Sequence, residues 1–459
     1  MSNALQIKKL DDFVYGRAPR PVKCGRGVVI GDGQVMPEIN FTLPPMNIEQ
    51  GTWQEVRAQY DQMITGILDR AVHLKVPQML VEFETLPEMT NRCEWGLEIT
   101  RLLADKMDQA YNDHGLKSAL RLTINDTREF NRPPVLRSGK YWDAMVKFME
   151  NAAANGADLL AIESTGGKEV SDEALVLADI NSVIFALGVL GARDMKFLWG
   201  HIVRICNKTG IVPSGDSACG FANTAMVLAE QKMIPTVFAA LVRVIAAPRS
   251  LVAITQGAKG PTKDCAYEGP FIKAIAGVPI ALEGKSASCA HLSPIGNISQ
   301  ALCDCWSNES VQNVRLLSAF APTVSMEQLA YDCRLMNTAA ASSRADALRL
   351  RDWLADSDSS IDPQAYILRP DVVLEISEKI AAHSHPYTQT VAAARAAHKA
   401  IKDGGLAGRL VLNDSDRKWL DILDMQLEMI PDTEEKLIEE MLARPDVSQK
   451  FLPKEYGIN

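Results

Sequence analysis

The sequence has 459 residues, of which 47% are hydrophobic and 23% are charged. These fractions are ordinary for a folded globular protein and exclude a disordered chain, a collagen-like fibre and a small disulfide scaffold. Asp and Glu number 57 against 48 Lys and Arg, which gives a formal net charge of −9. A surface of that sign repels phosphate backbones, so we expect no nucleic-acid partner.

The sequence also indicates where the protein resides. Its most apolar segment, residues 233–254, carries Arg243 and Arg249, well short of the roughly 20 uninterrupted apolar residues that a membrane span needs. Residues 1–20 lack the apolar core of a secretion signal. We therefore expect a cytoplasmic protein outside the membrane, whose nine cysteines are thiols or metal ligands rather than disulfides.

Short β-rich apolar runs alternate with longer amphipathic segments along the first two thirds of the chain. In residues 53–72 the apolar positions recur at intervals of three and four, which predicts a helix. The predicted strands are 39–43 (INFTL), 79–83 (MLVEF), 119–124 (ALRLTI), 159–163 (LLAIE), 211–216 (IVPSGD), 251–256 (LVAITQ), 279–284 (PIALEG) and 314–319 (VRLLSA).

Eight strands that alternate with helices favour an α/β fold of the (β/α)8 TIM-barrel type. Strands that are apolar throughout suit a parallel sheet buried on both faces. An open doubly wound sheet is the alternative, because the same alternation permits it.

Beyond about residue 320 the pattern contains only helices. They are predicted at 326–337, 341–354, 373–382 and 392–401, followed by a long acidic helical stretch at 416–442. We therefore expect a barrel with an N-terminal extension over residues 1–324, and a C-terminal helical extension over 325–459 that packs on the barrel or on a partner.

Three residues with metal-binding side chains fall at or just beyond the ends of the fourth, fifth and sixth predicted strands: Glu163, Cys219 and Cys265. Adjacent strand ends in a closed barrel lie about 5 Å apart, so the three side chains can converge on one ion. Two thiolates and a carboxylate suit Zn²⁺, and three protein ligands leave the open position of a catalytic zinc. Because no C-x-x-C pair is present, the spacing by itself favours small buried packing residues over metal ligands for the two cysteines.

Four long stretches resemble the zinc-containing methanol:corrinoid methyltransferase subunit family: SGDSACGFANTAMVLAE, GPTKDCAYEGPF, EGKSASCAHLSPIGN and CDCWSNESVQN. The likeness extends from VVIGDGQVMPEINFTLP near the N-terminus to RLMNTAAAS. The resemblance implies a TIM barrel whose zinc ligands are one Glu and two Cys. The matching residues are Glu163, Cys219 and Cys265, the same three that the strand ends indicate.

The resemblance also implies a reaction. A zinc ion binds the oxygen of methanol as a Lewis acid, and the methyl group passes to the Co(I) of a corrinoid held on a separate protein. This chain contains no D-x-H-x-x-G motif of its own for a corrinoid, so it needs that partner. The acid that protonates the departing oxygen is open among residues of the site loops: Asp216, Asp264, Tyr267, Glu268 and Glu169.

We expect a stable complex with the corrinoid protein and a homodimer of this chain within a hetero-oligomer, because helical faces commonly serve as docking surfaces. Two alternatives remain from the sequence. One is a zinc barrel that transfers methyl groups to or from a thiol, and the other is a non-catalytic partner-binding subunit.

Overall fold

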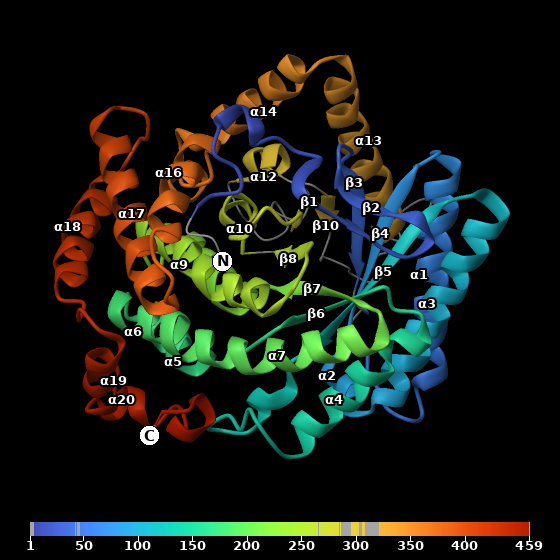
Figure 1. Cartoon of the computed structure of the whole chain (residues 1–459), viewed down its shortest axis with the longest axis horizontal. Helices are drawn as coiled ribbons and strands as arrows, with labels where there is room; N and C mark the ends of the chain where they lie inside the picture. Colours follow the sequence, from blue (N-terminus) through green and yellow to red (C-terminus); the bar gives the residue numbers. More distant parts are fainter. Residues whose placement is uncertain are drawn as a thin grey trace.

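The computed structural model describes residues 4–41, 43, 46–264, 266–283, 285, 295–302, 305–307 and 321–458 (Figure 1). Eight parallel strands form one sheet in the order β7-β6-β5-β4-β3-β10-β9-β8. The chain just before β8 pairs with β7, because Lys259 N donates to Pro213 O and Gly260 N donates to Ser214 O, each at 2.8 Å. The sheet is therefore closed, which confirms the (β/α)8 barrel and excludes the open doubly wound sheet.

The strands of the barrel and the helices around it follow one another in chain order. The strands are β3 (Met36–Phe41), β4 (Gln78–Glu84), β5 (Lys117–Asn125), β6 (Leu159–Glu163), β7 (Val212–Asp216), β8 (Thr262–Asp264), β9 (Ile280–Glu283) and β10 (Cys305–Ser307). The helices between them are α1 (Trp53–His73), α2 (Pro87–Asn91), α3 (Cys93–His114), α4 (Lys140–Ala152), α5 (Lys168–Val176), α6 (Ile180–Ile184), α7 (Ala192–Thr209), α8 (Thr224–Glu230), α9 (Thr236–Gln256), α10 (Gly269–Ala276) and α12 (Gly296–Leu302). Two π-helical segments, η5 (Phe185–Gly191) and η6 (Cys219–Asn223), precede α7 and α8.

Six of the eight predicted strands are confirmed, within a few residues at their ends. The strand predicted at 251–256 is wrong, because these residues are the last turns of α9. This helix is buried on all sides over most of its length and so lacks the polar face by which a helix is recognised. The sixth barrel strand is instead β8, and the strand predicted at 314–319 lies outside the described residues.

α9 is also the one described helix that is long and apolar enough to cross a membrane by length and composition. Its most apolar window lies entirely inside the protein. The helix therefore forms part of the core, packed between α7 and α17.

The chain after β10 is helical throughout its described part. Its helices are α13 (Ala321–Ser342), α14 (Arg344–Ser359), α15 (Pro363–Tyr366), α16 (Pro370–Ala381), α17 (Pro386–Leu406), α18 (Asp414–Glu428), α19 (Glu434–Leu442) and α20 (Pro445–Ser448). The acidic stretch predicted as helical at 416–442 comprises two helices, α18 and α19, with Pro431 between them. α13 packs on α1 and β3, and α17 packs along α9 (Figure 1); the division into two domains at residue 325 remains a prediction.

An antiparallel hairpin near the N-terminus, β1 (Arg17–Lys23) and β2 (Val29–Asp32), covers one end of the barrel. Its residues Val28 and Ile30 pack in a small apolar cluster on side chains from the first residues of the barrel strands, such as Leu80 and Leu159. This end of the barrel is therefore closed, and the strand ends that carry the predicted ligands lie at the other end.

The layer of the barrel interior next to this cluster is charged. Arg121, Glu38 and Glu82 are each 0% exposed. Arg121 forms an ion pair with Glu38, lies 3.8 Å from the Glu82 carboxylate and donates to Pro261 O at 3.0 Å. Barrel interiors are commonly filled by branched apolar residues, and buried charges persist only where partners compensate their lost hydration.

We predict that Arg121→Met lowers the free energy of unfolding by about 3–5 kcal/mol, because it removes a buried cation that offsets the charges of two buried carboxylates. Urea unfolding measures the change. The matched control is Arg344→Met, which breaks an ion pair with Asp12 whose side chains are 62% and 52% exposed and should cost at most about 1 kcal/mol. Equal, small losses in both variants would show that the interior ion pair does not stabilise the barrel.

Candidate functional site

The structure places the first two predicted ligands on neighbouring strands. Glu163 is the last residue of β6, and Cys219 begins η6 three residues after the end of β7. These strands pair in parallel, with Ile162 opposite Asp216. The third predicted ligand, Cys265, follows the last residue of β8 in the sequence and lies outside the described residues.

Glu163 belongs to a cluster of charged side chains inside the barrel. Its carboxylate forms an ion pair with the Lys263 ammonium of β8. The same ammonium lies 3.2 Å from Glu84 and 3.9 Å from Glu82, and only 1% of the Lys263 side chain is exposed. Burial alone would raise the pKa of Glu84, but Lys263 and a hydrogen bond from Asn40 hold it below its ordinary value.

The described part of the barrel interior carries more negative than positive charge. Four carboxylates, those of Glu38, Glu82, Glu84 and Glu163, are arranged around two cations, Arg121 and Lys263. The excess is two formal negative charges. Such an excess inside a low-dielectric barrel attracts a divalent cation.

The Cys219 sulfur has a hydrogen-bond donor beside it. The Asn223 side-chain amide, four residues further along η6, lies 3.7 Å from this sulfur in donor geometry, and such a donor favours a negatively charged sulfur.

Among the described residues no group of three or more His, Cys, Asp or Glu side chains is arranged to hold a metal ion. Cys265 is not one of these residues. The described structure thus supplies one carboxylate, Glu163, one cysteine, Cys219, and an excess of negative charge near them.

Asp216, a candidate for the general acid, directs its carboxylate towards the surrounding helices. It accepts hydrogen bonds from Trp199 Nε1 of α7 at 2.9 Å and from Ser164 N at 3.3 Å, and it pairs with Arg249 of α9 at 3.3 Å. A register shift between β6 and β7 precedes it. Burial raises the pKa of Asp216, with Arg249 and the hydrogen bonds opposing the shift.

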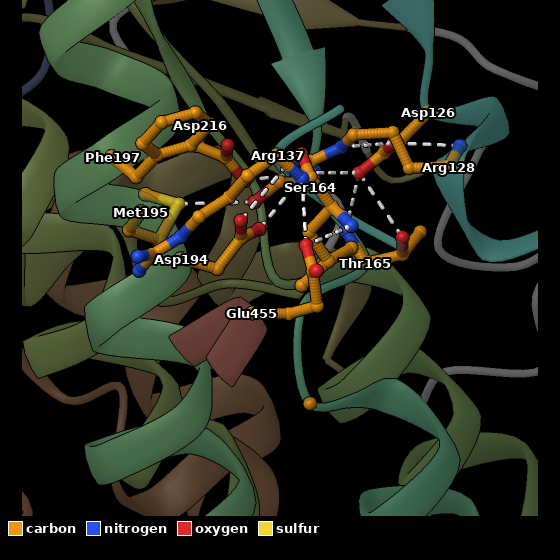
Figure 2. Close-up of polar contacts among 12 residues, drawn as sticks. Asp126, Arg128, Arg137, Ser164, Thr165, Asp194, Met195, Phe197, Asp216 and Glu455 are labelled. Carbon is orange, nitrogen blue, oxygen red and sulfur yellow. Dashed lines mark hydrogen bonds and ion pairs between the residues drawn. The ribbon is translucent and has the colours of Figure 1, made fainter. Parts of the chain in front are cut away.

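A second buried ion cluster holds the loop that follows Glu163 (Figure 2). The Arg128 guanidinium pairs with Asp126 at 2.7 Å and with Asp194 of α7 at 2.8 Å, and Asp126 accepts from Thr165 N at 2.9 Å. Burial alone would raise the pKa of Asp126, but Arg128 and the hydrogen bonds bring it below its ordinary value. Burial raises the pKa of Asp194, with Arg128 opposing.

The C-terminal segment supports the same loops from outside. The Glu455 carboxylate accepts from Leu136 N and Arg137 N, each at 3.0 Å, and the Tyr456 hydroxyl accepts from Gly167 N at 3.0 Å. Figure 2 shows Glu455 close to the Arg128 cluster. Segments nearly 300 residues apart in the sequence therefore fix the position of the chain just beyond Glu163.

Helix α9 contacts all three loops that carry the predicted ligands. Arg249 donates to Ser164 O at 2.6 Å, after β6, and to Ser217 O at 3.5 Å, after β7. Arg243 donates to Ala266 O at 2.7 Å, after β8. Both arginines are 0% exposed.

The sequence analysis did not assign a role to Arg243, Arg249, Lys263 or Asn223. A signal for the two arginines was present, since a charge within the most apolar segment of a chain is buried and must have a partner. For Lys263 and Asn223 the signal was their proximity to Cys265 and Cys219 in the sequence.

Comparisons with known proteins agree along the whole chain. The family model described as methanol-cobalamin methyltransferase B subunit matches residues 1–457. A methanol–corrinoid protein co-methyltransferase of Methanosarcina barkeri is 38% identical over 453 residues, which cover 97% of each chain. The crystal structure of the methanol:cobalamin methyltransferase complex MtaBC from Methanosarcina barkeri contains a chain that superposes with a TM-score of 0.94 at 36% identity, covering 100% of this chain and 99% of that one. The chain belongs to the methanol-cobalamin methyltransferase B subunit family.

Proposed function

We propose that this protein is a zinc-dependent methanol–corrinoid protein co-methyltransferase, which cleaves the C–O bond of methanol and passes the methyl group to the Co(I) of a corrinoid on a partner protein. Methanol activity and the corrinoid partner rest on the match to the family and to its relatives over the whole chain. The observation that supports the metal is the donor set at the barrel end, where Glu163 and Cys219 follow neighbouring strands.

The assigned donor set, of which Glu163 and Cys219 are described residues, suits a zinc ion. A carboxylate and two sulfurs suit a borderline-soft cation better than Mg²⁺ or Ca²⁺, which prefer all-oxygen ligands. We assign Glu163, Cys219 and Cys265 as the ligands; when bound there, zinc supplies Lewis acidity to the alcohol oxygen.

The chain's own residues position this site. Lys263 orients the Glu163 carboxylate, and Asn223 donates to the Cys219 sulfur. Outer partners of this kind typically contribute 10- to 100-fold to metal affinity or activity. Asp216 is held by three donors from its own loops and helices, so we assign it a positioning role rather than that of the acid.

The partner supplies what this chain lacks. Since the methyl acceptor is a corrinoid on another protein, the end of the barrel that carries Glu163 and Cys219 has to admit a flat corrin ring. We infer that the corrinoid protein docks over this end, that the helices after β10 contribute to a homodimer within the hetero-oligomer, and that the complex works in the cytoplasm.

We predict about one zinc ion per chain, measured by elemental analysis of purified protein, and its loss in Cys219→Ala. Cys333→Ala is the control, because Cys333 is a buried cysteine of α13 that is not among the assigned ligands, and this variant should keep its zinc. Glu163→Gln keeps an oxygen donor but removes a charge, so it should bind zinc more weakly. Full zinc content in Cys219→Ala would remove Cys219 from the ligand set.

A second prediction concerns the reaction. Added cob(I)alamin should be methylated by methanol in the presence of the protein, followed by its change in visible absorption, and a zinc chelator should abolish the reaction. A methylated thiol offered in place of methanol should give no methylcobalamin. Methylation of cob(I)alamin by methanol that persists after complete removal of zinc would contradict the proposed chemistry. Methylation by the methylated thiol but not by methanol would show that the substrate is a methylated thiol.

A further inference from the structure

The Glu268 side chain makes hydrogen bonds that neither the proposed metal ligation nor the proposed methyl transfer explains. It lies three residues after Cys265, immediately before α10, and is 0% exposed. A residue at this place commonly caps its own helix, but the Glu268 side chain makes no capping bond. Its Oε1 atom instead accepts from Ala218 N at 2.8 Å and from the Ser250 hydroxyl of α9 at 2.8 Å.

Ala218 is the residue before Cys219, and both its N–H and its carbonyl form hydrogen bonds. Its N–H donates to Glu268, and its carbonyl accepts from Phe221 N and Ala222 N at 3.0 Å each. These last two bonds begin η6, the π-helical turn whose first residue is Cys219. The position of the Ala218 peptide therefore sets the position of Cys219.

The loop that carries Glu268 is itself held in a strained conformation. Tyr267 has φ of +64°, a region that residues other than glycine adopt only when their surroundings enforce it. The Arg243 guanidinium enforces it from α9, 5.0 Å from the Tyr267 ring centroid and bonded to Ala266 O. The Glu268 side chain thus extends from a fixed loop to the neighbouring loop.

The two carboxylate oxygens of Glu268 differ in their surroundings. Oε1 accepts both hydrogen bonds, whereas Oε2 is buried and has no hydrogen-bond partner among the described residues. An acceptor at the Oε1 position is all that the link to Ala218 needs. An amide side chain of the same length offers that acceptor, and a shorter carboxylate does not reach it.

We propose that Glu268 is a positioning residue that fixes the Cys219 loop relative to the Cys265 loop, and that it acts through the reach of its side chain rather than through its charge. The inference rests on the proposed function for the purpose of the link, which is to present two cysteines to one metal ion. The hydrogen bond from Ala218 N to Glu268 itself involves only residues of this chain.

Two substitutions of Glu268 separate the effect of side-chain length from the effect of charge. Glu268→Asp keeps the charge but shortens the side chain by one methylene, so the bond to Ala218 N is lost. Glu268→Gln keeps the length and an acceptor oxygen but removes the charge. We expect zinc affinity, measured by competition with a chromogenic chelator, to fall about 10- to 100-fold in Glu268→Asp and to stay within about threefold of the unsubstituted protein in Glu268→Gln.

Two further readouts do not depend on turnover. With Co²⁺ in place of zinc, the visible bands of a tetrahedral thiolate site should shift in Glu268→Asp and not in Glu268→Gln. Hydrogen exchange of the metal-free protein, followed by mass spectrometry, should be faster at residues 217–223 in Glu268→Asp only, because the Ala218 amide loses its acceptor. Glu434→Gln serves as the control, since Glu434 is a buried carboxylate that pairs with Arg193 away from these loops.

Each outcome decides the inference. Zinc affinity and exchange that are unchanged in Glu268→Asp would overturn it, and so would equal losses in both variants, which would show that the charge matters. If Glu268→Asp does not fold, Glu268→Gln decides by itself, because a loss beyond threefold would contradict a role based on reach. If the unsubstituted protein binds no zinc, the proposed function fails, and the exchange experiment still tests the link.

Discussion

A charged side chain inside a protein has to find a partner, and α9 buries two arginines whose partners are the loops of the site. Arg249 binds the loops after β6 and β7, and Arg243 binds the loop after β8. Leaving either guanidinium unpaired would cost several kcal/mol, so the loops cannot move away from α9 independently. The helix therefore holds three separate loops at fixed positions relative to one another, which is what a metal site built from three strands requires.

Buried charges inside the barrel also lie next to the site. An apolar interior would be more stable, since buried ion pairs commonly contribute less than well-packed hydrophobic residues. Here Glu82, Arg121 and Lys263 occupy that space, and they connect the closed end of the barrel with Glu163 at the opposite end. The protein thus accepts a less stable core and obtains an environment that favours a divalent cation beside a preorganised carboxylate.

Part of this arrangement can be predicted from the sequence, and particular residues show which part cannot. The strand that ends at Glu163 was predictable because its apolar run is short and is followed by a polar, glycine-containing loop. α9 was not, because a helix buried on all sides shows no periodic pattern, and residues 251–256 are rich enough in β-branched residues to resemble a strand. Pairings such as Arg249 with Ser164, or Glu268 with Ala218, join residues far apart in the chain, and one sequence carries no record of such contacts.

The measurement that tests the central claim most directly is X-ray absorption at the zinc edge of the purified protein. A site made of Glu163, Cys219 and Cys265 predicts two sulfur neighbours at about 2.3 Å, with the remaining ligands being oxygen at about 2.0–2.2 Å. Replacing Cys219 with alanine should remove one of the two sulfurs or the metal itself. A shell of four sulfurs, or one without sulfur, would contradict the account.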